Sequence, residues 1–451
     1  MDYISSAEVD AILGKLSPTE PSEFGGEQWL RQYASWSKLN VQAHISSSQN
    51  PNFPLIEEFQ NERLASLLVR ELVLSDVWRL SVMPKIQAKT KRSVKFYFAR
   101  FQEVTLLNLF ELLSVNQHVV QAVGQNSVDL ADYCYSKASQ LLAKFRGWHE
   151  KIGRDEHVDE HCELDLSSCL LSLVILRNLA DNLKTLPVSI VSFLLKEKDV
   201  LMLLVALIEE RPWFRKNEKG REQFVNNRFV QVESSELDAV NIFEAQVWIA
   251  ILHFFFSEEA ATSYEITDYR KNQLLRLKKY LNEVLVDQIP ALASLQRSLE
   301  QLSIANSQAQ VAGNPFVIQS VPSLMTELAK AFESSLDKQI QIFSTQYSKK
   351  EQSAIEELCD SFSQPIPEAR RELGTKCACC GSKAEKRCSR CKKTWYCSKE
   401  CQVKDFKAGH KAICKDPSSA KATPDIKLPQ ASADIKEAEK PPETCEFDDL
   451  D

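Results

Sequence analysis

Apolar residues recur every three or four positions along most of the chain, which is the spacing of an α-helix with a buried face. Leu166, Leu170 and Leu173 belong to one such run, and the run that starts at Val200 is apolar throughout. Because alternating apolar and polar runs extend over only a few positions, we expect strands to be scarce. The pattern predicts helices over residues 164–183, 200–208, 240–256 and 272–286, and another that ends near residue 304.

Composition favours a mostly α fold. The 451 residues are 44% hydrophobic and include only 11 glycines, which fits one or two helical domains. Helices joined by short breaks are typical of HEAT-like or armadillo-like solenoids, although no strict repeat of about 40 residues is present. We therefore predict a solenoid-like helical body over residues 1–304 and a linker over residues 305–321. No apolar run approaches the ~18 residues of a membrane span, so we expect a soluble protein.

A second helical pattern covers residues 322–362, where apolar positions recur from Leu324 to Phe343. Ser348 and Glu351 have the spacing of a capping box. The predicted long helix would either form a seam for a partner or a second copy, or pack on the end of the solenoid. We favour packing, because fewer than four clean heptads are present. A linker over residues 363–376, with Pro365 and Pro367, would follow.

The tail over residues 415–451 has ten acidic residues, five lysines and five prolines. This composition predicts an acidic, disordered tail. Its last six residues, Glu-Phe-Asp-Asp-Leu-Asp, resemble the peptides by which cytosolic chaperones bind tetratricopeptide-repeat proteins. The alternative is that the tail only increases solubility.

Between Cys377 and Cys414, seven of the eight cysteines and one histidine fall into four closely spaced pairs. Pairs two or three residues apart can place both ligands on one Zn²⁺, so four pairs predict two closed, structural zinc sites. Disulfides are disfavoured, because eight of the thirteen cysteines crowd this stretch and no signal peptide follows Met1. Cys379 is a spare, since it would crowd the pair that contains Cys380.

The order and spacing of these ligands resemble the MYND-type zinc finger, including the Trp395-Tyr396-Cys397 run. The resemblance implies that the two quartets are cross-braced and that the finger covers residues 377–414. The first zinc would then be bound by Cys377, Cys380, Cys397 and Cys401. The second would be bound by Cys388, Cys391, His410 and Cys414.

MYND fingers are known mainly as docking modules for short peptides. The positions that match the family's peptide groove are Ser389, Gln402 and Phe406. Phe406 stands where a tryptophan is common, so the groove lacks an indole N–H donor. Equally, Phe406 would simply pack beneath the last helix of the finger, and the sequence leaves both interpretations open.

Charge distinguishes the finger from the rest of the chain. Ten basic and three acidic side chains give it a formal charge of +7, on a chain of net charge −7. Seven thiolates and two Zn²⁺ would lower the finger's charge to about +4. Because neither interleaved aromatics nor a long basic helix face is present, an acidic protein partner fits better than nucleic acid.

Catalytic motifs are scarce. His157-Val158-Asp159-Glu160-His161 matches the H-x-x-E-H spelling of some zinc proteases, but its hydrophilic surroundings favour an exposed loop or adventitious metal binding with Cys162. Phosphate-binding loops, dinucleotide-binding glycine motifs and the nucleophile elbow are absent from the sequence. The SET-type methyltransferases that carry MYND fingers need many strands and a motif that is missing here. We therefore predict no enzymatic activity.

Several segments of the helical body, together with the finger, resemble a family of axonemal dynein assembly factors that carry a C-terminal MYND finger. The resemblance implies a cytoplasmic adaptor in cells that build motile cilia or flagella, and thus a role in sperm motility. Its implied partners are a leucine-rich-repeat assembly factor, chaperones, tetratricopeptide-type co-chaperones and axonemal dynein chains. The segments of the body that carry it are residues 38–43, 128–134, 246–250, 274–277 and 285–290.

The alternative is a nuclear MYND-type transcriptional co-regulator. Lys89-Thr90-Lys91-Arg92 would serve as a weak import signal in such a protein, although short basic runs are usually solvated surface.

Overall fold

The fold was obtained as a computed structural model, and its first unit is a helical body. The chain divides into two compact units, Met1–Ile366 and Pro367–Asp451, which are described separately. The structure describes residues 3–50, 52–89, 94–151, 156–217, 220–225, 228–233, 238–304, 321–345, 348–363, 379–380, 386–387 and 395–410. The predicted linkers at 305–321 and 363–376 and the predicted tail lie largely or wholly outside them.

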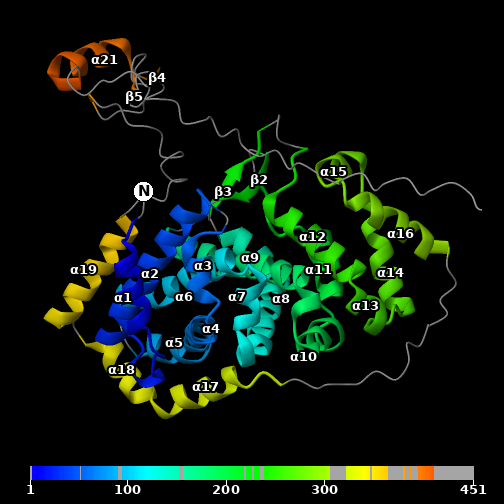
Figure 1. Cartoon of the computed structure of the whole chain (residues 1–451), viewed down its shortest axis with the longest axis horizontal. Coiled ribbons are helices and arrows are strands. Elements are labelled where there is room, and N and C mark those ends of the chain that lie inside the picture. The colour runs from blue at the N-terminus through cyan, green and yellow to red at the C-terminus, as the bar shows by residue number, and fades with distance from the viewer. Residues whose placement is uncertain are drawn as a thin grey trace, which may run out of the picture. The chain divides into compact units, whose positions relative to one another are not determined.

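The first unit is mostly helical, as predicted (Figure 1). Ser, Thr and Asn side chains accept hydrogen bonds from first-turn backbone N–H groups of several helices, for example Asn61 at α4 and Thr267 at α14. Its α-helices before the linker are α1 (Ser6–Lys15), α2 (Glu27–Ser47), α3 (Pro54–Phe59), α4 (Glu62–Val77), α5 (Met83–Gln87), α6 (Val94–Leu113), α7 (Gln117–Ala122), α8 (Ser127–Lys151), α9 (Glu156–Asp181), α10 (Val188–Ser192), α11 (Val200–Glu210), α12 (Ile242–Phe256), α13 (Glu258–Ser263), α14 (Asp268–Arg276), α15 (Glu283–Gln288) and α16 (Leu292–Ile304). Short 3-10 or π segments are η1 (Pro21–Glu23), η2 (Trp78–Val82), η3 (Gly124–Asn126), η4 (Leu183–Thr185), η5 (Phe193–Glu197) and η7 (Leu277–Lys279).

Helix α9 lies at the centre of the packing, against α6, α8 and α12. Its apolar residues are buried on more than one face, as the run through Leu166, Leu170 and Leu173 predicts. The predicted helices over 164–183, 200–208 and 240–256 correspond to α9, α11 and α12. Among the described residues, none of the helices combines the length and apolar character that a bilayer crossing requires.

Two expectations about helix bounds are wrong. The stretch from His157 to His161 belongs to α9, which begins at Glu156, and is therefore helical and not a loop. Acidic residues near a helix N-terminus interact favourably with the helix dipole, so a polar sequence there does not exclude a helix. The helix predicted over 272–286 is broken, because α14 ends at Arg276 and Asn282 caps a new helix by accepting from the Leu285 N–H at 2.9 Å.

A three-stranded antiparallel sheet interrupts the helices and was not anticipated by sequence periodicity. Strands β1 (Phe214–Asn217), β2 (Gly220–Val225) and β3 (Arg228–Gln231) pair in the order β1-β2-β3, with Phe214 opposite Gln223 and Phe224 opposite Phe229. Figure 1 shows the sheet beside α12 at one edge of the unit. The strands are too short and too rich in charged residues to give a clear alternating signal.

After the linker, the chain returns to the N-terminal helices. We call residues 321–363 the return segment; it contains α17 (Leu324–Ser334), α18 (Leu336–Ser344) and α19 (Lys349–Ser363) in place of the predicted single long helix. Figure 1 shows these helices, in yellow, beside the blue N-terminal ones, and α19 packs on α2. The regular stacking of a solenoid is not confirmed.

The return segment is held by aromatic packing and by one buried amide. The Phe343 ring lies 4.8 Å from the Trp78 ring and 5.0 Å from the Phe96 ring. Gln339 accepts a hydrogen bond from Trp78 Nε1 at 3.0 Å and donates to the carbonyl oxygens of Pro21 and Phe24. A buried amide whose donors and acceptor are all used fixes the register of α18 on the body.

The start and the middle of the return segment are also fixed by polar contacts. The Leu324 N–H donates to Asp129 Oδ1 at 2.9 Å, and the Lys95 ammonium donates to the Ile342 carbonyl oxygen at 2.9 Å. The capping box predicted at α19 is confirmed, since the N–H groups of Ser348 and Glu351 each donate to the other residue's side chain.

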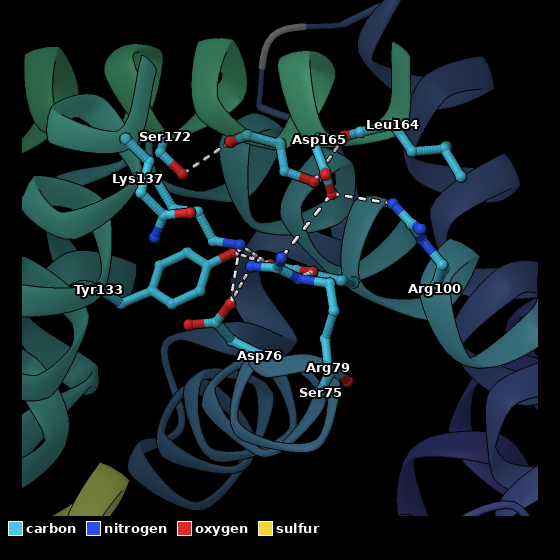
Figure 2. Close-up of polar contacts among 12 residues, drawn as sticks. Ser75, Asp76, Arg79, Arg100, Tyr133, Lys137, Leu164, Asp165 and Ser172 are labelled. Atoms are coloured by element: carbon cyan, nitrogen blue, oxygen red, sulfur yellow. Dashed lines mark hydrogen bonds and ion pairs between the residues drawn. The ribbon is translucent and has the colours of Figure 1, made fainter. Parts of the chain in front are cut away.

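A group of buried charges connects four helical elements of the body (Figure 2). Lys137 of α8 lies between Asp76 and Glu103, with its ammonium 2.8 Å from Asp76 Oδ1. Arg79 donates to Asp76 at 2.5 Å and to Glu103 at 3.0 Å, and the Tyr133 hydroxyl donates to Glu103 at 2.7 Å. Burial opposes ionisation of Glu103, but the Lys137 and Arg79 charges outweigh it and lower the pKa of Glu103 to about 2.

The group continues to α9 through Asp165. Arg100 Nη2 donates to Asp165 Oδ1 at 3.0 Å, and Arg79 Nη1 lies 3.8 Å from the same oxygen. The three bases are thus matched by three acids. Because every charge has an opposite partner, we interpret the group as a device that specifies how these helices pack.

Candidate metal centre

The described part of the second unit is built around one short helix. Strands β4 (Lys386–Arg387) and β5 (Trp395–Tyr396) pair antiparallel, and α21 (Lys399–Asp405) and the π segment η8 (Phe406–His410) follow. The Ser398 side chain accepts from the Cys401 N–H at 3.3 Å and so caps α21. The cap fixes Cys401 in the first turn of the helix, three residues after Ser398 and five after Tyr396, which ends β5.

Three of the predicted zinc ligands converge at this point. The Cys397 Sγ atom lies 3.5 Å from the Cys380 sulfur and 3.6 Å from the Cys401 sulfur. All three sulfurs lie within 4.8 Å of one another. In a tetrahedral site with Zn–S bonds of about 2.3 Å, two ligand sulfurs are separated by about 3.8 Å. The cluster therefore has the donor type and spacing that Zn²⁺ requires.

His410, predicted for the second site, is buried, with 5% of its surface exposed. Its ring lies edge-on to Tyr396 at 6.1 Å and to Phe406 at 6.2 Å between centroids. The fully buried Tyr396 donates its hydroxyl hydrogen to Asp405 Oδ2 at 2.7 Å. This contact between β5 and the end of α21 was missed by sequence reasoning, because nothing in the spacing of the ligands involves it.

The other predicted ligands, Cys377, Cys388, Cys391 and Cys414, lie outside the described residues, as does Ser389. Cys379 is half-buried and is not one of the three convergent cysteines.

The two described positions of the predicted peptide groove, Gln402 and Phe406, are half-buried. Phe406 contacts His410, so it supports a candidate ligand as well as part of the surface. A neighbouring face of α21 and η8 carries Lys399, Val403 and Lys407, one helical turn apart, around an open groove of about 460 Å³ in which Val403 is 47% exposed. This i, i+4 spacing was available in the sequence and predicts a shared helix face.

Comparison with known proteins is consistent with this geometry. The MYND finger family model matches residues 377–414. The chain is 25% identical to the zinc finger MYND domain-containing protein 10 homolog of Drosophila melanogaster over 457 aligned residues, which cover 92% of this chain and 99% of that protein.

Two further relatives match short stretches only. Ubiquitin carboxyl-terminal hydrolase 19 of Arabidopsis thaliana is 48% identical over 48 residues, 11% of this chain and 7% of that protein. Programmed cell death protein 2 of the mouse is 40% identical over 65 residues, 12% of this chain and 19% of that protein. No solved structure matches the chain. The chain thus carries a zinc-binding type of module, the MYND finger, and is similar along nearly its whole length to the Drosophila zinc finger MYND domain-containing protein 10 homolog.

Proposed function

We propose that this protein is a non-catalytic adaptor of the co-chaperone type for the cytoplasmic pre-assembly of axonemal dynein arms, which motile cilia and flagella require. The observation that carries the proposal is the similarity to the Drosophila protein over 92% of this chain and 99% of that one. A similarity of this extent includes the helical body as well as the finger. The finger alone would support only a general docking role.

We also propose that the finger holds two structural zinc ions in cross-braced quartets. The first would use Cys380, Cys397 and Cys401 together with Cys377, and the sulfur geometry of the three described cysteines supports it. The second would combine His410 with Cys388, Cys391 and Cys414. Sites with four protein ligands leave no open position for a substrate, so their role is to fold the finger.

In this proposal the finger presents a docking surface, and the body presents a large helical scaffold to a client. Gln402 and Phe406, with Ser389, would contact a peptide of the leucine-rich-repeat assembly factor or of a tetratricopeptide-type co-chaperone. Axonemal dynein chains would be the clients. The buried charge group and the return segment support this role by holding the scaffold in one arrangement.

The test uses ciliated cells that lack the protein and are supplied with the full chain or with Cys397→Ser. We expect the full chain to restore dynein heavy chains in the axoneme and the Cys397→Ser variant to fail, because the first zinc site loses a ligand. Cys379→Ser is the matched control, since Cys379 is outside the cluster, and it should restore dynein fully. The measurement is heavy-chain content of isolated axonemes.

Two outcomes would count against the proposal. Normal axonemal dynein in cells that lack the protein would exclude the assembly role altogether. Nuclear accumulation of the tagged full chain, with no cytoplasmic pool, would favour the co-regulator interpretation instead.

A further inference from the structure

The β1–β3 sheet has an inner face, which packs on the body through Phe224, and an outer face, on which Gln223 accepts a hydrogen bond from Asn241 at the start of α12. Successive strand residues point to opposite faces, so Phe224 and its cross-strand partner Phe229 share the inner face. Phe224 is buried, and Phe229 packs edge-on against His149 of α8 at 5.1 Å. Arg215 and Glu222, also on this face, form an ion pair at 2.6 Å. Glu222, the acidic side chain of β2, is thus already paired on the inner face.

The outer face carries the alternate residues of the same strands. Cross-strand pairing brings Lys216 opposite Arg221, and Val225 opposite Arg228. Gln223 pairs with Phe214 on one neighbouring strand and with Val230 on the other, and Val230 is 40% exposed. None of the described strand residues on this face is acidic. The outer face is therefore a basic surface with apolar patches.

Two of the bases have no carboxylate within ion-pair distance among the described residues. Neither Lys216 nor Arg221 makes an ion pair there, although Arg221 packs on the Phe214 ring with its guanidinium carbon 3.6 Å from the ring centre. Arg211, which is paired with Glu244 at 2.7 Å, lies 4.9 Å from the same ring. Burial, and then the Arg211 charge, lower the pKa of Arg221, and the Glu244 charge opposes this shift.

This arrangement costs stability in the isolated chain. Like charges directly opposite each other in an antiparallel pair repel, as Lys216 and Arg221 do here. An anion bound between the Lys216 and Arg221 side chains would remove their repulsion. Relief of this repulsion would then add to the free energy of binding.

We propose that the outer face of the β1–β3 sheet binds an acidic, aliphatic-containing segment of a partner protein. Its carboxylates would pair with Lys216 and Arg221. Its aliphatic side chains would cover Val225 and Val230, which a purely ionic ligand would leave in water.

Nucleic acid fits this face less well. Single-stranded nucleic acid gains affinity by stacking bases on exposed aromatic rings. The aromatic ring on the outer face, Phe214, is already in contact with the Arg221 guanidinium. The chain's net charge of −7 would also repel a polyanion longer than the face itself.

The test measures binding of a fluorescein-labelled peptide, made of four Glu-Glu-Leu repeats, to the full chain by fluorescence anisotropy. Hydrogen–deuterium exchange localises the peptide, because the finger is basic as well. We expect the peptide to slow exchange in residues 214–231. In the double variant Lys216→Gln/Arg221→Gln, we expect about tenfold more peptide to be needed for the same protection of residues 214–231.

The matched control is Lys278→Gln/Arg297→Gln, which removes two exposed cations elsewhere on the body and should leave protection of 214–231 unchanged. If the double variant unfolds, as its thermal transition would reveal, the single change Lys216→Gln at an exposed position serves instead and should weaken protection about threefold.

Three results would overturn the proposal. Protection of 214–231 that is unchanged in the double variant would exclude these bases. Tighter binding of a 12-residue single-stranded RNA, with the same localisation, would assign the face to nucleic acid. Protection that exists without peptide and disappears on removal of residues 415–451 would assign the face to the chain's own acidic tail.

Discussion

Lys137 places its ammonium group between two buried carboxylates, those of Asp76 and Glu103. Each of these groups loses its hydration when the body folds, so the stability of the cluster depends on every charge being matched. The sequence does not reveal this charge cluster, because the three residues lie on three helices and are separated by up to 61 positions. Only the packing of α4, α6 and α8 brings them together.

Lys137→Met tests the cluster directly. The substitution leaves a net negative charge buried beside Asp76 and Glu103, and we expect it to lower the free energy of unfolding by about 3–5 kcal/mol. Urea denaturation of the full chain, followed by circular dichroism, measures the change. Lys144→Met, at an exposed position of the same helix, should change it by less than about 0.5 kcal/mol. Equal effects of both changes would contradict the interpretation.

Acid should weaken the body through Glu103. Its pKa is lowered from 4.5 to about 2, so its contribution to stability is present above pH 4.5 and is lost as the pH falls toward 2. The shift corresponds to about 3 kcal/mol between those limits. In Glu103→Gln, unfolding free energies measured from pH 6 to pH 2.5 should depend less on pH by about that amount. The exposed Glu333→Gln should keep the normal slope, and a slope retained in Glu103→Gln would refute the assignment.

The zinc ligands are the residues that sequence reasoning could address best. Pair spacing, which is set by the reach of the chain around one ion, marked Cys380, Cys397 and Cys401 as ligands. The resemblance to the MYND finger implied that they share one ion, and the structure brings them together. The supporting contact between Tyr396 and Asp405 was not predictable, because a hydrogen bond between residues nine positions apart leaves no periodic signal in the sequence.

At the scale of elements, the return segment depends on a close approach between α18 and the turn after η1. Gly25 has φ of +85°, and a Cβ there would lie 2.4 Å from Phe343 Cε2. Two separate reasons therefore require glycine: the left-handed backbone and the aromatic ring above it.

A double-mutant cycle separates the two reasons. We expect Phe343→Ala to cost about 3–5 kcal/mol, since it leaves a cavity beside Trp78 and Phe96. Gly25→Ala should be destabilising in the natural chain, but should cost only about 1–2 kcal/mol in the Phe343→Ala background, where backbone strain alone remains. Urea denaturation of the four chains gives the coupling. Additive effects would show that the ring does not restrict position 25.

Helix bounds were predictable where caps and apolar runs agree, as at α12 and α19. They were not predictable where a cap interrupts an apolar run, as Asn282 does between α14 and α15. The β1–β3 sheet was invisible because its stability comes from Trp213 and Phe224, which are buried by contacts with distant helices. Likewise, the amphipathic pattern of the return segment predicts a buried face but not which surface buries it.

At the scale of the whole molecule, the chain consists of two units with different sources of stability. The first has an extensive apolar core, whereas the described part of the second has few buried side chains, among them Tyr396 and His410. A small module of this kind depends on metal for most of its folding free energy, typically about 10–16 kcal/mol of apparent zinc binding.

Chelation should therefore unfold the second unit and leave the first unit folded. We expect excess EDTA to release zinc, to raise amide exchange in residues 395–410 to the rate of an unfolded chain, and to leave exchange in α8 and α9 unchanged. Exchange mass spectrometry with zinc-loaded protein as the reference measures both. Loss of protection in α8 and α9 on chelation would contradict the independence of the units.

The contact between Lys95 and the Ile342 carbonyl joins residues 247 positions apart. At roughly 5–20 residues per second, a ribosome needs roughly 12–50 s to synthesise the chain between them. During that interval Trp78 and Phe96 are already made, while Phe343, which covers them, is not. The nascent body thus leaves the Trp78 and Phe96 rings without this cover until Phe343 is made, so a protein proposed to assist the folding of others would itself need shielding while it is being synthesised.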